Sequence, residues 1–352
     1  MNYATVAPIV EGLQKDPRLE IFFTASESPH LLDEIYSDAR PPYQLVRPAT
    51  AAFLHFDAYL TADFLWARLP RGTRRVQTFH GVAGKYRTVY DSPSDSMRGW
   101  DRLFFINRLR LQNFIDTGAI DEDSPAIRLI GMPKLDCLVD GSLERHQVLT
   151  SLGIDPSRRT VLYAPTWSKY SSLAVMGEEI VRRLGAAGYA LIVKLHDRSR
   201  QGDDFHSGGV DWGERLCPLL QTSGGVLATG SNSSLYLVAA DVLITDHSSV
   251  GFEYLLLDRP LIRIHLPELL KKTDIEPVYV QLMAEASSRV ISIDQLISAV
   301  EEGFEDPNRR SDSRKAVASE MFYEPGGATA RAISEMYDVI EISRAEEAQE
   351  RT

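Results

Sequence analysis

The chain is poor in cysteine, with only Cys137 and Cys217 among its 352 residues. Two cysteines cannot build a disulfide framework, and this pair does not have the spacing of metal ligands. No run of about 18 apolar residues occurs, so no transmembrane helix is expected. The N-terminus lacks a basic segment followed by an apolar one, so we expect no secretory signal. These absences predict a protein of the reducing cytoplasm.

Positive charge is also in short supply. The chain has 38 Lys and Arg against 49 Asp and Glu, and its formal net charge is −11. Nonspecific nucleic-acid binding needs clustered positive charge, so no nucleic-acid partner is expected. A ligand that carries phosphate must then be held by a local site. The 44% hydrophobic and 25% charged residues are typical of a folded globular chain.

Several motifs of nucleotide, hydrolase and metal chemistry are missing. The chain has neither a Gly-x-x-x-x-Gly-Lys-Ser/Thr loop nor a Gly-x-Gly-x-x-Gly fingerprint. It also lacks a Gly-x-Ser-x-Gly elbow and a His-Glu-x-x-His zinc pattern. Asp121 and Asp123 form an Asp-x-Asp pair, which we interpret as part of a solvated acidic loop. We therefore expect no metal ion and no cofactor.

Short apolar runs alternate with longer amphipathic stretches along the chain. The runs are rich in Val, Ile, Leu and Phe without strict alternation, which is typical of strands buried on both faces. We expect strands at 19–24, 44–47, 58–61, 75–79, 103–106 and 127–130, and then at 160–164, 190–195, 226–228, 241–245, 260–264 and 290–293. Helical spacing lies between them, for example at 106–117, 174–187 and 293–303. This alternation predicts an α/β fold with parallel sheets.

Two series of six strands predict two Rossmann-like domains that face each other across a cleft. The polar, turn-rich residues 139–142 separate them, so we assign residues 1–141 to the first domain and 142–325 to the second. Residues 326–352 should form a long amphipathic helix that packs back on the first domain, followed by a tail. The first readable element, near residues 6–15, is helical. Either an opening strand is absent or the true start lies upstream.

The strongest local motif is the turn Thr245-Asp246-His247-Ser248-Ser249, between an apolar strand and a helix. Asp and Ser are favoured helix N-caps, and the amides that they cap also suit a phosphate. Ligands of open parallel sheets bind at the carboxyl ends of the strands, where this turn lies. The turn is therefore either a simple helix cap or a phosphate site.

Histidines occupy three predicted strand ends: His80, His196 and His247. Gly81 beside His80 permits close backbone approach, and Lys85 supplies a positive charge for phosphate. Each histidine alone can be structural, and the glycine can belong to an ordinary loop. Three histidines at the edge where ligands bind are a stronger indication of a site.

Two further segments carry hydroxyls at strand ends or helix starts. Thr166 and Ser168 follow the strand at 160–164 and could contact a phosphate or a base edge. An equally good interpretation is structural: Pro165 ends the strand and Trp167 packs beside it. Ser233 lies in a run of polar residues before a helix. That run is a second helix cap or a second anion site.

Five motifs in this order resemble the CDP-glycerol glycerophosphotransferases, the teichoic-acid polymerase and primase family with a GT-B fold. They are His80-Gly81, Gly131-Met132-Pro133-Lys134-Leu135-Asp136, Tyr163-Ala164-Pro165-Thr166-Trp167, Lys194-Leu195-His196 and Ile244-Thr245-Asp246-His247-Ser248-Ser249. The resemblance runs from about Gln77 to Pro260, roughly half the chain. Each motif is weak alone, whereas the ordered set is fairly specific.

The resemblance implies that His80 and His196 are catalytic and that the turn at 245–249 holds the nucleotide diphosphate. It also implies that Glu253 contacts the ribose. The expected nucleotide- and phosphate-binding residues are Gly81, Lys85, Thr166, Lys194, Ser233, Thr245, Asp246, His247, Ser248, Ser249 and Glu253. This chain departs from the usual family pattern at four places. The family usually has Tyr at the position of His247, Pro at that of Asp197 and Asp at that of Glu253. It also usually has Thr-Pro-Leu-Lys at 82–85, where this chain has Val-Ala-Gly-Lys.

The implied activity transfers an alcohol phosphate, such as glycerol phosphate or a similar polyol phosphate, from a CDP-alcohol to an acceptor hydroxyl. CMP would be released, in the synthesis of a cell-surface polymer. We expect His80 to act as the general base, and His196 either to donate to the phosphate oxygens or to protonate the departing CMP. The expected partners are the CDP-alcohol and a hydroxyl acceptor, a lipid-linked polymer included, with at most peripheral association at the inner face of the membrane.

Three other functions remain open from the sequence. The same turn can hold any nucleotide diphosphate, so a GT-B glycosyltransferase that uses a UDP- or GDP-sugar is one alternative. A sugar-nucleotide epimerase with the same two-domain shape is another. A binding relative without catalysis is the third, and the presence of both His80 and His196 argues against it.

Overall fold

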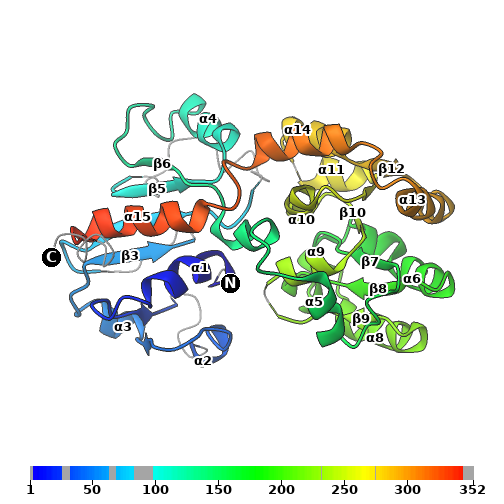
Figure 1. Cartoon of the computed structure of the whole chain (residues 1–352), viewed down its shortest axis with the longest axis horizontal. Coiled ribbons are helices and arrows are strands. Elements are labelled where there is room, and N and C mark those ends of the chain that lie inside the picture. The colour runs from blue at the N-terminus through cyan, green and yellow to red at the C-terminus, as the bar shows by residue number, and fades with distance from the viewer. Residues whose placement is uncertain are drawn as a thin grey trace. The chain divides into compact units, whose positions relative to one another are not determined.

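A computed structural model describes residues 3–25, 32–62, 69–82, 98–230, 232–273 and 275–343. These residues form two compact units (Figure 1). Unit 1 contains the described residues up to Val82, those from 98 to Asp136, and those from Phe322 onward. Unit 2 contains the described residues between Cys137 and Met321. Each unit has its own sheet and its own hydrophobic core.

Unit 2 is built on one sheet of six parallel strands in the order β12-β11-β10-β7-β8-β9. The strands are β7 (Thr160–Tyr163), β8 (Ala190–Val193), β9 (Val226–Leu227), β10 (Val242–Thr245), β11 (Leu261–Ile264) and β12 (Ser288–Val290). From β7 the chain adds strands outward to β9 and then returns to β10 on the other side. The order therefore reverses between β7 and β10, as in doubly wound nucleotide-binding folds.

The strands of unit 2 are buried because helices cover the sheet. Every residue of β7, β8, β10 and β11 is buried, which explains why their sequences show no polar alternation. One core cluster joins these strands to α6, α8 and α13. The helical segments are α5 (Arg145–Ser151), α6 (Ser172–Ala186), η4 (Asp197–Arg200), α7 (Asp204–Ser207), α8 (Trp212–Ser223), α9 (Ser234–Ala239), α10 (Ser249–Tyr254), η5 (Leu255–Leu257), α11 (Pro267–Thr273), α12 (Pro277–Ala286), α13 (Ile293–Glu305) and α14 (Ser311–Met321).

Unit 1 has a parallel sheet in the order β3-β4-β5-β6 and a separate parallel pair, β1-β2. The strands are β1 (Phe22–Phe23), β2 (Gln44–Leu45), β3 (Ala58–Thr61), β4 (Arg74–Thr78), β5 (Arg102–Phe105) and β6 (Ile127–Leu129). All six predicted strands of the first half occur, but they do not form one series. β1 and β2 have two residues each and β2 is exposed, so the pair buries too little surface to extend the larger sheet.

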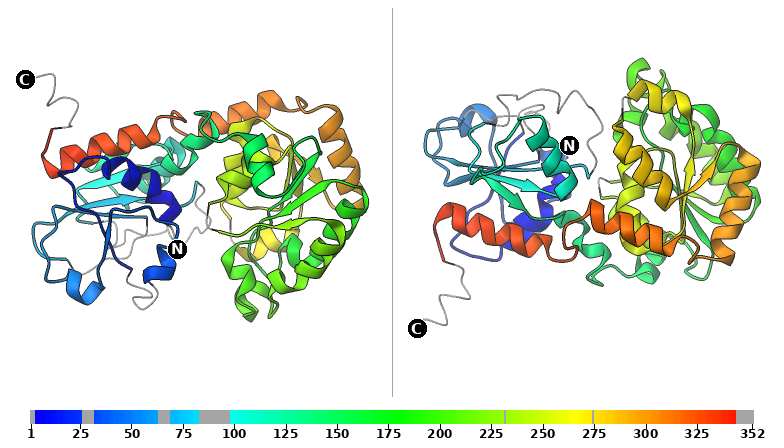
Figure 2. Two further views of the ribbon diagram at one scale, coloured as in Figure 1. Left: turned by 60° about the horizontal axis from the view of Figure 1, so that its bottom comes forward. Right: turned by 90° about the horizontal axis from the view of Figure 1, so that it is seen from above.

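The helical segments of unit 1 are α1 (Tyr3–Leu13), α2 (Leu32–Ile35), α3 (Pro48–Ala51), α4 (Arg108–Asp116) and α15 (Ala328–Ile340). The short helix η3 (Pro133–Leu138) contains the boundary between Asp136 and Cys137, where the chain passes from unit 1 to unit 2. The last helix, α15, packs against α1 and β3, and both views of Figure 2 show it beside α1. Its start is fixed by Asp136, whose carboxylate accepts hydrogen bonds from the amides of Gly326, Ala328 and Thr329 at 2.7–3.2 Å. Two motifs far apart in the sequence thus meet at one helix end.

A close approach just before η3 explains one glycine of the predicted motifs. Gly131 has φ +89°, and a Cβ there would lie 2.5 Å from the carbonyl oxygen of Tyr323. The α/β class with parallel sheets, predicted from the sequence, is confirmed. Among the described residues, no helix has both the length and the apolar character to cross a membrane.

Candidate functional site

The residues predicted to bind nucleotide in unit 2 lie largely at one edge of its sheet. β10, β7 and β8 are parallel neighbours, so their carboxyl ends share an edge. The turn 246–249 follows β10, Thr166 follows β7, and His196 follows β8. This edge includes the switch point between β7 and β10, where open α/β sheets bind ligands.

Asp246 is fully buried and links three segments at this edge. Its Oδ1 accepts from the amides of Thr166 at 2.8 Å and His247 at 2.7 Å. Its Oδ2 accepts from the amide and the hydroxyl of Ser172, both at 2.9 Å, at the start of α6. Burial raises the pKa of Asp246, and these hydrogen bonds act in the opposite direction. The carboxylate therefore positions the turn, while its predicted contact with nucleotide stays a prediction.

One of the two interpretations of this motif is a simple side-chain cap of α10, and no hydrogen bond among the described residues supports it. Ser248 is the N-cap residue of α10, but its side chain accepts no hydrogen bond from the helix. The Asp246 carboxylate bonds instead to α6 and to the residue after β7. The hydroxyl of Thr245 also turns to the neighbouring strand and donates to the carbonyl of Ala164 at 2.7 Å. Ser248 and Ser249 remain half-buried at the edge.

His196 is exposed and caps η4 with its ring. Nδ1 accepts a hydrogen bond from the amide of Arg198 at 3.2 Å. An accepting Nδ1 carries no proton, so the neutral ring holds its proton on Nε2. Trp167 lies beside it, with ring centroids 6.1 Å apart, and the Arg198 guanidinium stacks 4.5 Å from the Trp167 centroid. Trp167 thus connects the β7 and β8 loops.

His80 is exposed and follows β4 in unit 1. Its Nδ1 lies 3.3 Å from the carbonyl oxygen of Ala62, which can only accept. Nδ1 therefore carries the proton in the neutral ring and Nε2 carries the lone pair. The carbonyl of Gly81 accepts from Arg110, whose guanidinium also stacks on Phe79. Lys85 lies outside the described residues.

Asn107 supports the loop after β4 from the start of α4. Its Oδ1 accepts from the amide of Arg110 at 2.7 Å, which caps the helix, and its Nδ2 donates to the carbonyl of Val82 at 3.3 Å. Asn107 and Arg110 were not singled out in the sequence. Both lie on a strand–helix junction, and an Asn before an amphipathic stretch is a recognisable cap signal.

Three further predicted residues have defined contacts. Glu253 on α10 is 3% exposed and accepts from the hydroxyl of Ser233 at 3.2 Å. The structure thus brings together two residues that were predicted from separate motifs. Lys194 donates to the carbonyl of Leu195 at 2.9 Å, and burial lowers its pKa.

Sequence reasoning missed a fourth histidine at a strand end. His265 directly follows β11, and β11 is the neighbour of β10. The rule that selected the other three histidines would have found it. Its partner in the structure is Arg263 of β11, at 3.2 Å. An arginine within an apolar run gives no sequence signal of a site.

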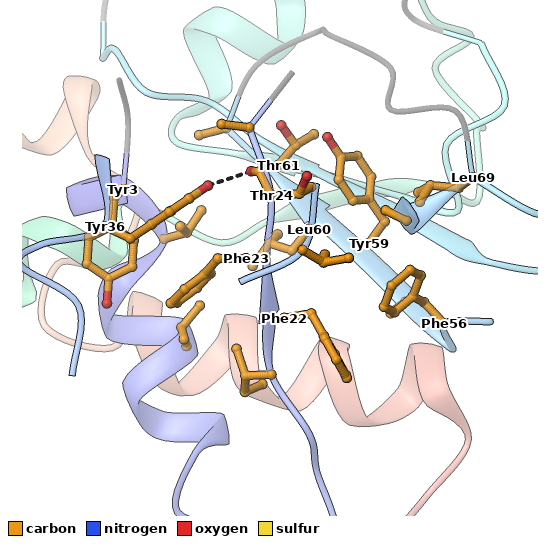
Figure 3. Close-up of a pocket in the computed structure, with 18 of the residues that line it drawn as sticks. Tyr3, Phe22, Phe23, Thr24, Tyr36, Phe56, Tyr59, Leu60, Thr61 and Leu69 are labelled. Carbon is orange, nitrogen blue, oxygen red and sulfur yellow. Dashed lines mark hydrogen bonds between the residues drawn. The ribbon is translucent and has the colours of Figure 1, made fainter. Parts of the chain in front are cut away.

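Unit 1 contains a cavity of about 260 Å³ that holds none of the predicted site residues (Figure 3). It lies among α1, β1, β3 and α3, and its lining is mainly apolar and aromatic. The dashed line in Figure 3 joins the Tyr36 hydroxyl to the carbonyl of Thr24, at 2.6 Å. Among the described residues, no cluster of three or more His, Cys, Asp or Glu side chains could hold a metal ion.

Comparison with solved structures shows a GT-B-like fold. The chain is similar to the wall teichoic acid polymerase TagF, with a TM-score of 0.73, 17% identity and coverage of 97% of this chain and 87% of that one. It is also similar to a UDP-GlcNAc 2-epimerase from Neisseria meningitidis, with a TM-score of 0.57, 14% identity and coverage of 95% of this chain and 96% of that one. At these identities the likeness concerns the fold alone.

Sequence comparison is more specific. A teichoic acid poly(glycerol phosphate) polymerase of Bacillus spizizenii is 26% identical over 234 residues, which are 58% of this chain and 54% of that protein. A teichoic acid glycerol-phosphate primase of Bacillus subtilis is 31% identical over 111 residues, 30% of this chain and 25% of that one. The chain thus spans about half the length of the polymerase that it matches. Residues 13–337 match the family described as CDP-Glycerol:Poly(glycerophosphate) glycerophosphotransferase, so the chain belongs to this family.

Proposed function

We propose that this chain transfers glycerol phosphate from CDP-glycerol to a hydroxyl of an acceptor polymer and releases CMP. Family membership over residues 13–337 supports the reaction class. The relatives named as poly(glycerol phosphate) polymerases support a polymer as the acceptor. We extend the proposal to a lipid-linked acceptor and peripheral association with the membrane that carries it.

One observation carries the proposed roles of the two histidines: they hold their ring protons on opposite nitrogens. His80 donates through Nδ1 to a backbone carbonyl, so its Nε2 lone pair can accept a proton. His196 accepts through Nδ1 from a backbone amide, so its Nε2–H can donate a hydrogen bond to a phosphate oxygen. Both side chains are exposed. A general base needs the first arrangement, and a hydrogen-bond donor to the charge that develops on the phosphate needs the second.

The reaction then follows with balanced bonds. Nε2 of His80 takes the proton of the acceptor hydroxyl as its oxygen attacks the phosphorus that carries glycerol. A new P–O bond forms to the acceptor, and the P–O bond to CMP breaks. The neutral His196 donates a hydrogen bond from Nε2–H to the phosphate oxygens or to the departing CMP and keeps its proton. The proton on His80 passes to solvent when the products leave. Such transfers depend on positioning and charge stabilisation rather than on a covalent intermediate with the protein.

Within unit 2, the edge that carries His196 also offers groups for the nucleotide. We propose that the half-buried Ser248 and Ser249 contact the diphosphate and that Glu253, held by Ser233, accepts from a ribose hydroxyl. Asp246 acts indirectly, because four donors of the protein already occupy its carboxylate. The Trp167 ring, which contacts His196 and the Arg198 guanidinium, adds an aromatic surface next to His196.

A donor panel tests the proposal. The full chain is incubated with an acceptor polymer and, separately, with CDP-glycerol, CDP-ribitol, UDP-N-acetylglucosamine or a GDP-sugar. We expect CMP release and a longer polymer with CDP-glycerol. Release of UDP or GDP, or conversion of the UDP-sugar to its epimer without release, would assign the chain to one of the two alternative activities. CMP release from CDP-ribitol alone would keep the reaction class and change the donor.

A further inference from the structure

Arg263 is a buried cation without an acidic partner. It lies in β11 and is 4% exposed. Its Nε donates to the hydroxyl of Ser287 at 3.3 Å, and its Nη1 lies 3.2 Å from Nδ1 of His265. Neither partner is an anion. No carboxylate of the described residues pairs with it, whereas the buried Arg314 of the same unit pairs with Asp258 at 2.8 Å.

Two more basic groups adjoin Arg263. Arg289 stands opposite it in the β11–β12 ladder and is exposed. His265 follows β11 and is partly exposed. Burial, and then the charges of Arg289 and Arg263, lower the pKa of His265. Within the described residues, no acidic side chain makes an ion pair with any member of this trio, named here the β11 basic cluster (Arg263, His265 and Arg289).

A buried charge normally has a counterion. Removing a guanidinium from water costs several kcal/mol, and native proteins offset that cost with a partner of opposite charge. Arg263 has only neutral hydrogen-bond partners, and the positive charge of Arg289 repels it. We propose that the β11 basic cluster binds a phosphate group and that this anion is the counterion of Arg263. Arg is suited to this task because its planar fork can donate two parallel hydrogen bonds to phosphate oxygens.

The place of the cluster in the sheet connects it to the proposed nucleotide site. β11 is the neighbour of β10, and Arg263 is the ladder partner of Thr245. His247 lies two residues after Thr245, and His265 lies two residues after Arg263. Both histidines therefore follow the carboxyl ends of their strands. The cluster therefore lies one strand beyond the turn at 246–249. This inference rests on the proposed function for its ligand: the phosphate belongs either to the CDP-alcohol donor or to the phosphodiester chain of the acceptor.

Binding of inorganic phosphate tests the cluster without any turnover. The full chain is titrated with phosphate against chloride at matched ionic strength, and the histidine Cε1–H signals are followed by NMR. The chain has eight histidines, and His265→Gln identifies the signal of His265. We expect phosphate to shift this signal in the natural chain. Arg263→Met should weaken the phosphate affinity measured there by about tenfold or more, the loss expected for a charged hydrogen-bonding partner.

Thermal unfolding separates a binding role from a structural one. If Arg263 has no counterion until phosphate binds, Arg263→Met removes an uncompensated buried charge. The Tm of the variant without phosphate should then be equal to or above that of the natural chain. Added phosphate should raise the Tm of the natural chain more than that of the variant. Arg183→Met is the matched control, because it removes an exposed arginine of the same unit and should keep the full phosphate response.

An unshifted His265 signal, or an Arg263→Met variant with the natural phosphate affinity, would overturn the proposal. If Arg263→Met does not fold, the phosphate affinity of Arg289→Met is measured through the same His265 signal. A weaker affinity supports the proposal, and an unchanged affinity overturns it. Steady-state kinetics then assign the phosphate: a raised KM for CDP-glycerol assigns it to the donor, and a raised KM for the acceptor polymer assigns it to the acceptor. A chain that binds phosphate through Arg263 but transfers nothing would refute the proposed function and leave the site intact.

Discussion

At the scale of single residues, backbone contacts select the tautomers of the two histidines. A carbonyl fixes the proton on Nδ1 of His80, and an amide fixes the lone pair on Nδ1 of His196. The sequence placed both rings at strand ends but could not assign the protons. These depend on which backbone atom faces each ring, and Ala62 is 18 residues from His80.

We expect His80→Ala to lower kcat by about 10²–10⁴-fold, the usual effect of removing an acid–base group, with little change in nucleotide affinity. His196→Ala should lower kcat within the same range. Turnover and thermal stability are measured on the same preparations. His146→Ala, at an exposed position of α5, is the control and should retain full turnover. Full turnover in either active-site variant would remove that histidine from the mechanism.

Two tyrosines of the apolar cavity in unit 1 allow a matched stability test. The hydroxyl of Tyr36 donates to the carbonyl of Thr24, whereas the buried hydroxyl of Tyr3 has no hydrogen-bond partner among the described residues. Burial raises the pKa of both phenols to about 12. Tyr36→Phe should destabilise the fold by about 1–2 kcal/mol, because a carbonyl loses its donor. Tyr3→Phe should be neutral or stabilise by up to about 1 kcal/mol. Urea unfolding of both variants measures the difference, and equal losses would contradict the assigned contacts.

At the scale of elements, the strands were predictable, whereas the hydrogen-bond partners of Asp246 were not. The apolar runs at 160–164 and 241–245 contain β7 and β10, because burial on both faces leaves a continuous apolar run in the sequence. From the sequence, Asp246 could cap the helix that follows it or belong to a phosphate site, and in the structure its carboxylate bonds to α6, more than 70 residues away in the sequence. Sequence patterns indicate which side chains can cap a helix; the direction of the side chain depends on tertiary packing.

The same limit explains why the β11 basic cluster was missed. His265 satisfied the strand-end rule, yet Arg263 stood inside an apolar run and carried no motif. Its significance comes from the absence of an acidic partner among the described residues around it, which only the assembled sheet reveals.

α15 gives the prediction at the element scale. Asp136 accepts from the amides of Gly326, Ala328 and Thr329 at the start of this helix. Asp136→Ala should destabilise unit 1 by about 2 kcal/mol, because several amides lose one charged acceptor. The matched control is Asp140→Ala, which removes an exposed carboxylate that accepts from the amide of Ser142. Thermal unfolding should show a clear loss for the first variant and almost none for the second. Equal Tm values would mean that α15 does not depend on this cap.

At the scale of the whole molecule, the two units have separate cores and different roles in the proposed reaction. The core of unit 2 joins its six-stranded sheet to α6, α8 and α13, and that of unit 1 joins its sheet to α1 and α15. The chain leaves unit 1 after Asp136 and returns at Phe322. The sequence predicted two α/β domains from the two series of strands, but it could not predict that β1 and β2 pair separately, because strand pairing depends on contacts distant in sequence.

Separate cores lead us to expect two transitions in calorimetric unfolding. Asp136→Ala should lower the transition temperature of unit 1, and Asp246→Asn should lower that of unit 2, so the two variants show which transition belongs to which unit.

CMP should raise only the transition temperature of unit 2, because a ligand stabilises the part of the chain that binds it. At about 100 times its Kd, the ligand contributes about 2.7 kcal/mol, which corresponds to about 5–10 °C for a unit of this size. Ser249→Ala should reduce this rise without moving the transition of unit 1. A rise confined to unit 1 would contradict the proposed placement of the nucleotide, because every group assigned to it in unit 2 lies on the sheet edge formed by β7, β8 and β10 or on the adjoining α10.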